Sequence, residues 1–125
     1  MNGTYLGCHF TNKEIIQYLE DINVPFNVYE DDKLFEKVAE LLDNGRVIGW
    51  FNGSMEFGPR ALGARSIIGD PRNENMQKIM NLKIKYRESF RPFAPSILEE
   101  DLKDYFELKQ ISPYMLLVSQ IKKKV

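Results

Sequence analysis

The stretch RVIGWFNGSMEFGPRALGARSIIG, residues 46–69, holds two short apolar runs on either side of a loop rich in glycine and charge. The first run, Arg46–Phe51, combines β-branched and aromatic residues, which predicts a buried strand. Ser66–Gly69 predicts a second short strand. Between them, Asn52–Gly63 has neither a helical nor a strand period, so we expect a shaped loop that ends with a turn of helix at Ala61-Leu62.

Helical patterns precede this stretch. Thr11-Asn12-Lys13-Glu14 has the composition of a capping box and predicts the start of a short helix. A second helix is expected over about Lys33–Asn44, because apolar residues recur there at a spacing of three to four. Gly45 is placed to end it. Val24–Tyr29, between the two helices, is open to two interpretations, a short strand or an extended link.

The second half of the chain continues the alternation. A helix is expected from Asn73 to about Ile84, with its apolar face formed by Met76, Ile79, Met80 and Ile84. Phe93–Leu98 is a candidate edge strand, Glu99–Phe106 a short helix, and Tyr114–Ile121 a final strand. Strands that alternate with helices without repeats predict an α/β (α+β) fold, and 125 residues suit one domain.

The charge of the chain is unevenly distributed. The formal net charge is only −1. Residues 60–91, however, carry eight basic and three acidic side chains, a local charge of +5, so the remainder carries −6. A basic centre in an acidic frame favours a local anion site over a broadly basic surface.

Several classes of function are disfavoured by composition. One cysteine, Cys8, excludes an internal disulfide, and a single histidine, His9, leaves no set of zinc ligands. The sequence contains no run of eighteen apolar residues and no signal-peptide pattern, so we expect no membrane segment and a cytoplasmic location. RNA binding is disfavoured, because a local charge of +5 is small beside the basic faces that phosphate backbones need.

Two arginines stand in the loop after the first predicted strand. Arg60 and Arg65 lie five residues apart among glycines, and Ser66 comes directly after Arg65. Glycine lets backbone N–H groups approach an anion closely, and arginine offers a planar fork for two oxygens. Loops that leave the ends of strands are also where open α/β sheets bind ligands.

A second basic segment covers residues 83–95, with the sequence KIKYRESFRPFAP. Four cations fall within nine residues, among them Lys85, Arg87 and Arg91. If this segment is extended, Lys85 and Arg87 point to the same face. Fixed cations of this kind stabilise the charge that develops on phosphate or carbamoyl oxygens. The alternative is a solvated basic surface whose aliphatic stems cover apolar neighbours.

Two motifs give the sequence a family resemblance. GWFNGSMEFGPRALGARS (residues 49–66) and IKYRESFRPFAP (residues 84–95) closely resemble segments that mark the C-terminal domain of NodU/CmcH-type O-carbamoyltransferases. Tyr5-Leu6-Gly7 and Ser112-Pro113-Tyr114-Met115 also resemble family stretches. The resemblance covers nearly the whole chain, and the two long motifs come in the family's order.

The resemblance implies a fold and a division into parts. The family's C-terminal domain is YrdC-like, a twisted mixed sheet with flanking helices. Residues 1–22 correspond to a linker region and short helix, and residues 23–125 to part of the YrdC-like domain. A Ser-x-Asn segment that such domains use is absent, which implies truncation at the C-terminus. The N-terminal Kae1-like domain, which holds the family's metal, would be a partner; no metal site is expected in this chain.

The resemblance also implies a reaction. The YrdC-like domain is thought to make carbamoyl-adenylate from carbamoyl phosphate and ATP, with Mg²⁺ as a companion of the nucleotide, before transfer to a hydroxyl acceptor. Lys85-Tyr86-Arg87 matches the family's Lys-x-Arg pair, so Lys85 and Arg87 are the expected catalytic residues. The expected substrate-binding residues are Arg60, Arg65, Ser66 and Arg91. We expect all these groups to converge on one pocket.

A non-catalytic role is the alternative. As a fragment, the chain would bind a nucleotide or another anion, or offer an interface, and would be inactive alone. A sheet that lacks its last strands exposes an edge and an apolar face, so self-association is expected as well.

Overall fold

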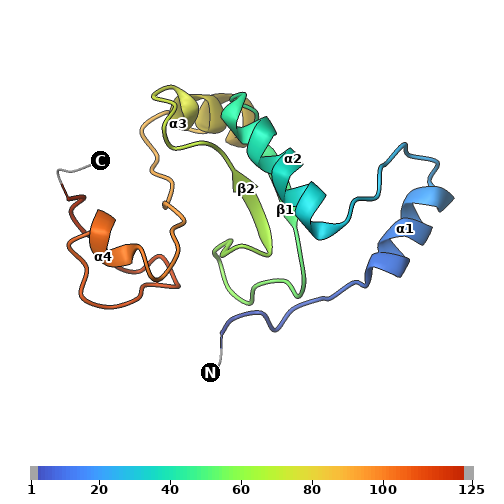
Figure 1. The fold of residues 1–125 in the computed structure, drawn as a ribbon, viewed down its shortest axis with the longest axis horizontal. Helices are drawn as coiled ribbons and strands as arrows, with labels where there is room; N and C mark the ends of the chain where they lie inside the picture. The colour runs from blue at the N-terminus through green and yellow to red at the C-terminus, as the bar shows by residue number, and fades with distance from the viewer. Residues whose placement is uncertain (1–2, 123–125) are drawn as a thin grey trace.

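The structure is a computed structural model that describes residues 3–122. The described residues form four α-helices, one π-helix and two strands that pair in one sheet. Figure 1 shows the course of the chain through the labelled helices and strands. The predicted mixed α/β class is confirmed, although the sheet is smaller than the twisted mixed sheet expected from the resemblance. The larger YrdC-like arrangement stays a prediction.

Helices α1 and α2 confirm the first two helical predictions within two residues. α1 spans Asn12–Asp21 and begins with the predicted capping box: the Thr11 hydroxyl accepts the Glu14 backbone N–H, and the Glu14 carboxylate accepts that of Thr11. α2 spans Asp31–Asp43. Gly45 lies just beyond it with a φ of 72°, a left-handed conformation in which glycine has no steric penalty, so it ends the helix as expected.

Strands β1 (Ile48–Phe51) and β2 (Arg65–Ile68) form an antiparallel hairpin. Ile48 pairs with Ile68 at one end, and Phe51 with Arg65 at the other. The residues between them form an irregular loop without the helical turn expected at Ala61-Leu62. The hairpin therefore has a loop end, closed by residues 52–64, and an open end at Ile48 and Ile68.

The predicted helix after β2 is shorter and changes type. α3 covers Met76–Ile79 and continues as the π-helix η1, Met80–Lys85. Met76 and Met80 are buried as predicted and pack on Gly69, where a Cβ atom would lie 2.8 Å from both sulfur atoms. Ile84 is exposed, contrary to prediction, because the wider π turn rotates the last residues away from the apolar face.

Two predicted strands are absent from the described part of the chain. Phe93–Leu98 is irregular, and Tyr114–Ile121 contributes only one bridge, between Ile121 and Phe106. Val24–Tyr29 is a link rather than a strand. A strand needs a neighbour to accept its hydrogen bonds, and within residues 3–122 these segments have none beyond the short contact of residues 120–122 with residues 105–107. The expected helix at 99–106 is present as α4, Leu102–Tyr105.

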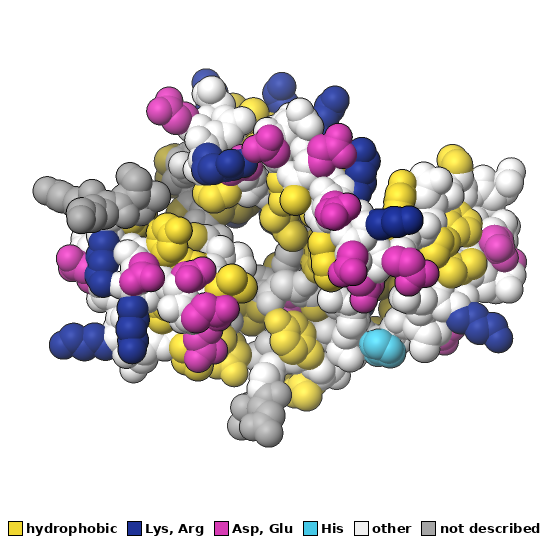
Figure 2. Space-filling model, in the orientation of Figure 1, with side chains coloured by type: hydrophobic (Ala, Val, Ile, Leu, Met, Phe, Trp, Pro, Cys, Tyr) yellow, Lys and Arg dark blue, Asp and Glu magenta, His cyan; other side chains and the backbone are white. Residues whose placement is uncertain are grey.

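The molecule exposes much more surface than a folded monomer of its mass. Its accessible surface is 10740 Å², whereas a monomeric protein of 14.6 kDa exposes about 6,900 Å². Figure 2 shows apolar side chains around a central hollow. The small core lies between β2, α3 and η1, where Met76 and Met80 meet Gly69. Most apolar side chains of the described chain therefore remain available to a partner.

Candidate anion-binding site

The loop end of the hairpin is organised around one buried carboxylate. Glu56 is 6% exposed and accepts the backbone N–H groups of Leu62 at 2.6 Å, Ala64 at 2.8 Å and Arg65 at 3.3 Å. Burial alone would raise its pKa, but the backbone donors outweigh burial and lower the pKa to about 2. The carboxylate is thus ionised and serves as the centre around which the loop folds.

The guanidinium of Arg65 closes the same loop. Its Nη1 donates to the carbonyls of Asn52 and Ala64 at 3.1 and 3.0 Å, and its Nη2 to those of Cys8 and Gly53 at 3.2 and 3.1 Å. Its central carbon lies 3.5 Å from the centre of the Phe51 ring. Both terminal nitrogens therefore bind backbone oxygens, and the guanidinium acts as a clamp on the loop.

The beginning of the chain is built into this loop. The Gly7 N–H donates to the Met55 carbonyl at 2.9 Å, and the Met55 N–H donates to the Cys8 carbonyl at 2.9 Å. A side chain at Gly7 would place a Cβ atom 3.0 Å from both the Cβ and the carbonyl oxygen of Met55, so only glycine fits without a shift. The Tyr5 hydroxyl adds a 2.6 Å bond to the Leu62 carbonyl. Residues 5–8 therefore fix the loop from outside.

The other two predicted residues of this region differ in their surroundings. Arg60 is exposed and lines a shallow cleft of about 180 Å³ with Phe57, Pro59 and Tyr114. The Ser66 hydroxyl accepts the Gly63 N–H at 2.9 Å, so its oxygen helps to close the loop. Of the three predicted ligand-binding residues here, Arg60 is the one directed to a cleft.

A second organised region lies around Asn81 in η1. Asn81 is 0% exposed. Its side-chain amide donates to the carbonyls of Ser89 at 3.1 Å and Arg91 at 2.8 Å, and its Oδ1 accepts the Arg87 Nε–H at 2.6 Å. Its own carbonyl accepts the N–H groups of Tyr86 and Arg87. One buried residue thus holds the whole turn 86–91.

Arg87 is fixed from two sides. Nε is bound to Asn81, and the guanidinium lies over the Phe93 ring at 4.9 Å from its centre. Among residues 3–122, neither Nη1 nor Nη2 has a hydrogen-bond partner. Lys85, the last residue of η1, is exposed, and Arg91 pairs with Glu88 at 3.2 Å. The Arg87 guanidinium is therefore a pre-oriented fork, which suits an oxyanion.

The segment that carries these cations is not extended, contrary to expectation. Lys85 ends a π-helix, and Tyr86 is left-handed with φ 50° and ψ 49°. The alternation that would set Lys85 and Arg87 on one face of a strand therefore does not apply. The carbonyl of Asn81 causes this turn, because it draws the N–H groups of both Tyr86 and Arg87 back toward η1.

The structure separates the predicted site residues into two groups. Arg60, Arg65 and Ser66 belong to the loop end of the hairpin, whereas Arg87 and Arg91 are tied to η1, which lies beyond the open end. Figure 1 shows the loop and the α3–η1 segment at opposite ends of the two strands. No hydrogen bond among the described residues connects the two groups, and the convergence of these side chains on one pocket stays a prediction.

Sequence reasoning missed the two residues that organise these groups. Glu56 is the one carboxylate between Asn52 and Gly63, a signal that could have marked it as the loop's internal acceptor. Asn81 stands between the apolar residues Met80 and Leu82. An amide in such a run is expected to be buried, and a buried amide needs hydrogen-bond partners. Both act on backbone groups, which leave no trace in the spacing of side chains.

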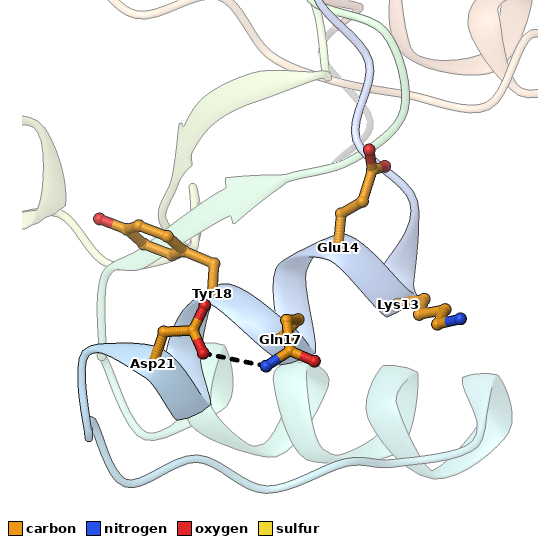
Figure 3. A pocket seen from close by; sticks show the side chains of 5 residues that line it. All are labelled: Lys13, Glu14, Gln17, Tyr18 and Asp21. Carbon is orange, nitrogen blue, oxygen red and sulfur yellow. Dashed lines mark hydrogen bonds between the residues drawn. The ribbon is translucent and has the colours of Figure 1, made fainter.

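A separate surface depression lies along α1. Figure 3 shows Lys13, Glu14, Gln17, Tyr18 and Asp21 around it, with a 2.9 Å bond from Gln17 to Asp21. All five side chains are exposed and their charges are mixed. This depression has neither a buried polar group nor a charge of one sign, so it is not a site candidate.

The part of the chain that the structure describes contains no group of three or more His, Cys, Asp or Glu side chains placed to hold a metal ion.

Within residues 3–122, none of the helices has both the length and the apolar character that crossing a bilayer requires.

Comparison with known proteins identifies the family. The family described as "Carbamoyltransferase C-terminus" matches residues 39–125. The chain belongs to this carbamoyltransferase C-terminal family. The resemblance to the C-terminal domain of NodU/CmcH-type enzymes, stated from the motifs at 49–66 and 84–95, is thereby confirmed.

Relatives place this family domain within longer proteins. An uncharacterized protein of Synechocystis is 61% identical over the whole chain, which covers 21% of that protein. The nodulation protein NolO of Bradyrhizobium diazoefficiens is 45% identical to the chain, in an alignment that covers 77% of the chain and 18% of NolO. The 3'-hydroxymethylcephem-O-carbamoyltransferase of Amycolatopsis lactamdurans is 37% identical over 70% of the chain and 16% of its length. The chain spans about a fifth of such relatives.

Proposed function

We propose that this chain is the part of an O-carbamoyltransferase that binds carbamoyl phosphate and ATP and supports formation of carbamoyl-adenylate. Family membership supports the transferase class. The observation that carries the finer proposal is the state of Arg87, whose guanidinium is held at Nε and by Phe93 while both terminal nitrogens face no protein partner among the described residues.

The proposed chemistry is electrostatic. Water would first cleave carbamoyl phosphate to carbamate and phosphate, and a carbamate oxygen would then attack the α-phosphorus of ATP and displace pyrophosphate. Negative charge builds on oxygens in both steps, and pre-oriented cations stabilise it without moving. Arg87 would bind two such oxygens, and Lys85 and Arg91 would add charge. Mg²⁺ is the expected companion of the nucleotide; we assign no metal ligand in this chain to it.

The loop end of the hairpin is proposed to contribute through Arg60. Arg60 lines a cleft, whereas Arg65 and Ser66 are engaged with the loop backbone. Arg60 lies at the loop end of the hairpin and Arg87 lies beyond its open end. The two side chains would therefore contact different parts of carbamoyl phosphate and ATP, or would act together only after another part of the protein brings the two ends of the hairpin closer. The proposal depends on Arg87 and does not require one shared pocket.

The test is loss of binding when Arg87 is replaced. Losing the hydrogen bonds of one charged group should cost about 1.5–3 kcal/mol, so Arg87→Ala should weaken ATP or carbamoyl phosphate binding by about tenfold or more. Isothermal titration calorimetry of the chain with each ligand measures this. Lys83→Ala is the matched control, because Lys83 is an exposed cation of η1 only four residues before Arg87.

Two outcomes would contradict the proposal. Unchanged affinity in Arg87→Ala would remove Arg87 from the site. An equal loss in Lys83→Ala would show that only the general positive charge of the region attracts the anions.

A non-catalytic binding module is the second candidate, and the separation of the two cation groups favours it for the chain alone. The isolated chain would then bind nucleotide saturably yet release no pyrophosphate when incubated with ATP and carbamoyl phosphate. Release of pyrophosphate at a rate that Arg87→Ala abolishes would instead assign the reaction to this chain.

The proposed partner is the Kae1-like domain of such an enzyme. Support comes from the surface, which exceeds that of a monomer of equal mass by more than half and is rich in apolar side chains. The same surface supports self-association when no such domain is present. We propose a cytoplasmic location on the composition of the sequence.

A further inference from the structure

We infer that Asn81 is the positioning residue of the site, and that it sets Arg87 to take two oxygens of an oxyanion end-on, through Nη1 and Nη2. This inference rests on the proposed role of Arg87 in binding. Asn81 is the most deeply buried polar residue that the structure describes, and its side chain contacts Arg87 directly.

The hydrogen bonds of Asn81 permit one orientation of its amide. The two neighbours on its nitrogen side are carbonyls, of Ser89 and Arg91, which only accept hydrogen bonds. The neighbour on its oxygen side is the Nε–H of Arg87, which only donates. If the amide were reversed, its oxygen would face two carbonyl oxygens and its NH2 group would face the Arg87 Nε–H. The side chain would then lose all three hydrogen bonds.

The consequence for Arg87 is a fixed direction. Nε is occupied at 2.6 Å, and one face of the guanidinium lies on the Phe93 ring. A carboxylate or phosphate can approach guanidinium along the side that includes Nε or along the end that carries Nη1 and Nη2. Because Asn81 occupies Nε, the end-on approach remains, and it suits a phosphate or a carbamoyl oxygen pair.

The backbone contacts of Asn81 reinforce this direction. Its carbonyl accepts the N–H of Arg87 at 3.0 Å, so the same residue holds both the main chain and the side chain of Arg87. Gln77, one turn earlier, donates to the Phe90 and Arg91 carbonyls but does not touch Arg87. The two amides therefore share the task of holding the turn, and Asn81 alone reaches the guanidinium.

The first experiment uses the unaltered chain and no ligand. In a ¹⁵N-resolved NMR spectrum, the Arg87 Nε–H should exchange with water markedly more slowly than the Nε–H of Arg60, which is exposed. In Asn81→Ala, or in Asn81→Leu where volume must be kept, the Arg87 signal should exchange as fast as that of Arg60. An Arg87 Nε–H that exchanges as fast as Arg60 in the unaltered chain overturns the inference.

The second experiment measures coupling, with inorganic pyrophosphate as the probe. Asn81→Ala should weaken binding about tenfold, the lower end of what loss of an orienting partner costs at metal sites. The same change in a chain that carries Arg87→Lys should have little further effect, since lysine keeps the charge but has no Nε–H for Asn81 to hold. Gln77→Ala should leave the affinity close to that of the unaltered chain.

The outcomes separate this inference from the proposed function. If Arg87→Lys weakens binding but Asn81→Ala does not, Arg87 binds the anion and the inference about Asn81 is wrong. If Asn81→Ala weakens binding equally in both backgrounds, Asn81 only supports the fold, and the inference is again wrong. If neither change matters, the inference about Asn81 is wrong. If Arg87→Ala also leaves the affinity unchanged, the proposed function fails with it, because pyrophosphate then binds elsewhere.

Discussion

Arg65, at the end of the loop of residues 52–64, and Arg87, in the turn of residues 86–91, are used in opposite ways. Arg65 directs both terminal nitrogens to four backbone carbonyls, whereas Arg87 is held at Nε and leaves its terminal nitrogens without partners in the described chain. Each loop is organised by a buried polar residue, Glu56 in one and Asn81 in the other. An arginine in a basic stretch is therefore a ligand-binding candidate only when its terminal nitrogens are not needed by the fold.

The largest expected effect comes from the carboxylate at the centre of the first loop. Glu56→Gln should lower the free energy of unfolding by about 3 kcal/mol at pH 7, because charge-assisted bonds to three N–H groups are weakened. The folded pKa of about 2 lies below the ordinary value of about 4.3, so this stabilisation is complete above about pH 4.5 and is lost as the pH falls toward 2.

Urea unfolding monitored by the fluorescence of Trp50, the only tryptophan, measures this effect across pH. The difference between the unaltered chain and Glu56→Gln should shrink on acidification. A difference that stays constant from pH 7 to about pH 2.5 would show that the Glu56 carboxylate does not hold the loop.

A smaller effect is expected for the clamp itself. Arg65→Lys should lower the free energy of unfolding by about 2 kcal/mol, since lysine cannot bond four carbonyls at once. Binding of pyrophosphate should stay unchanged. Arg72→Lys is the control, because the Arg72 guanidinium is exposed and lysine keeps the charge that pairs with Asp43 and Asp70. Should Arg65→Lys abolish anion binding while stability is kept, the contrast between the two arginines would be wrong.

The smallest effect concerns the turn that presents Arg87. Tyr86 is left-handed and 86% exposed, so replacing its ring removes little packing. Tyr86→Ile should lower the free energy of unfolding by about 1 kcal/mol, because a β-branched residue resists positive φ, whereas Tyr86→Asn should be tolerated. The same urea titration compares them. Equal stabilities would mean that the backbone at position 86 is not held as described.

The sequence predicts well the features that depend on side-chain periodicity. Both early helices, the two strands of the hairpin and the burial of Met76 and Met80 can be derived from apolar spacing and capping residues. The strands expected at 93–98 and 114–121 fail for another reason. Their residues suit a sheet, but strand formation depends on a neighbour, and residue patterns do not say whether a neighbour is present.

The residue types of the candidate site can be proposed from the sequence, but their arrangement cannot. Arg87 was identified from a motif, and Arg60 from its glycine-rich setting. The arrangement of the two arginines depends on Glu56 and Asn81, and apart from the Arg87 Nε–H the partners of these two side chains are main-chain N–H and C=O groups. Every residue offers a main-chain carbonyl and all but proline an N–H, so their use cannot be read from composition or spacing.

The π-helical turns at Met80–Lys85 make the length of this segment matter as much as its residues. A π turn contains more residues than an α turn, and each residue added to or removed from a helix rotates all later residues by about 100°. A one-residue deletion between Asn81 and Arg87 would keep both residues, but it would point the guanidinium of Arg87 in a different direction. If a related sequence has a one-residue gap in this segment, the arginine that corresponds to Arg87 is not expected to bind an anion in the same way, even when no residue of the segment is substituted.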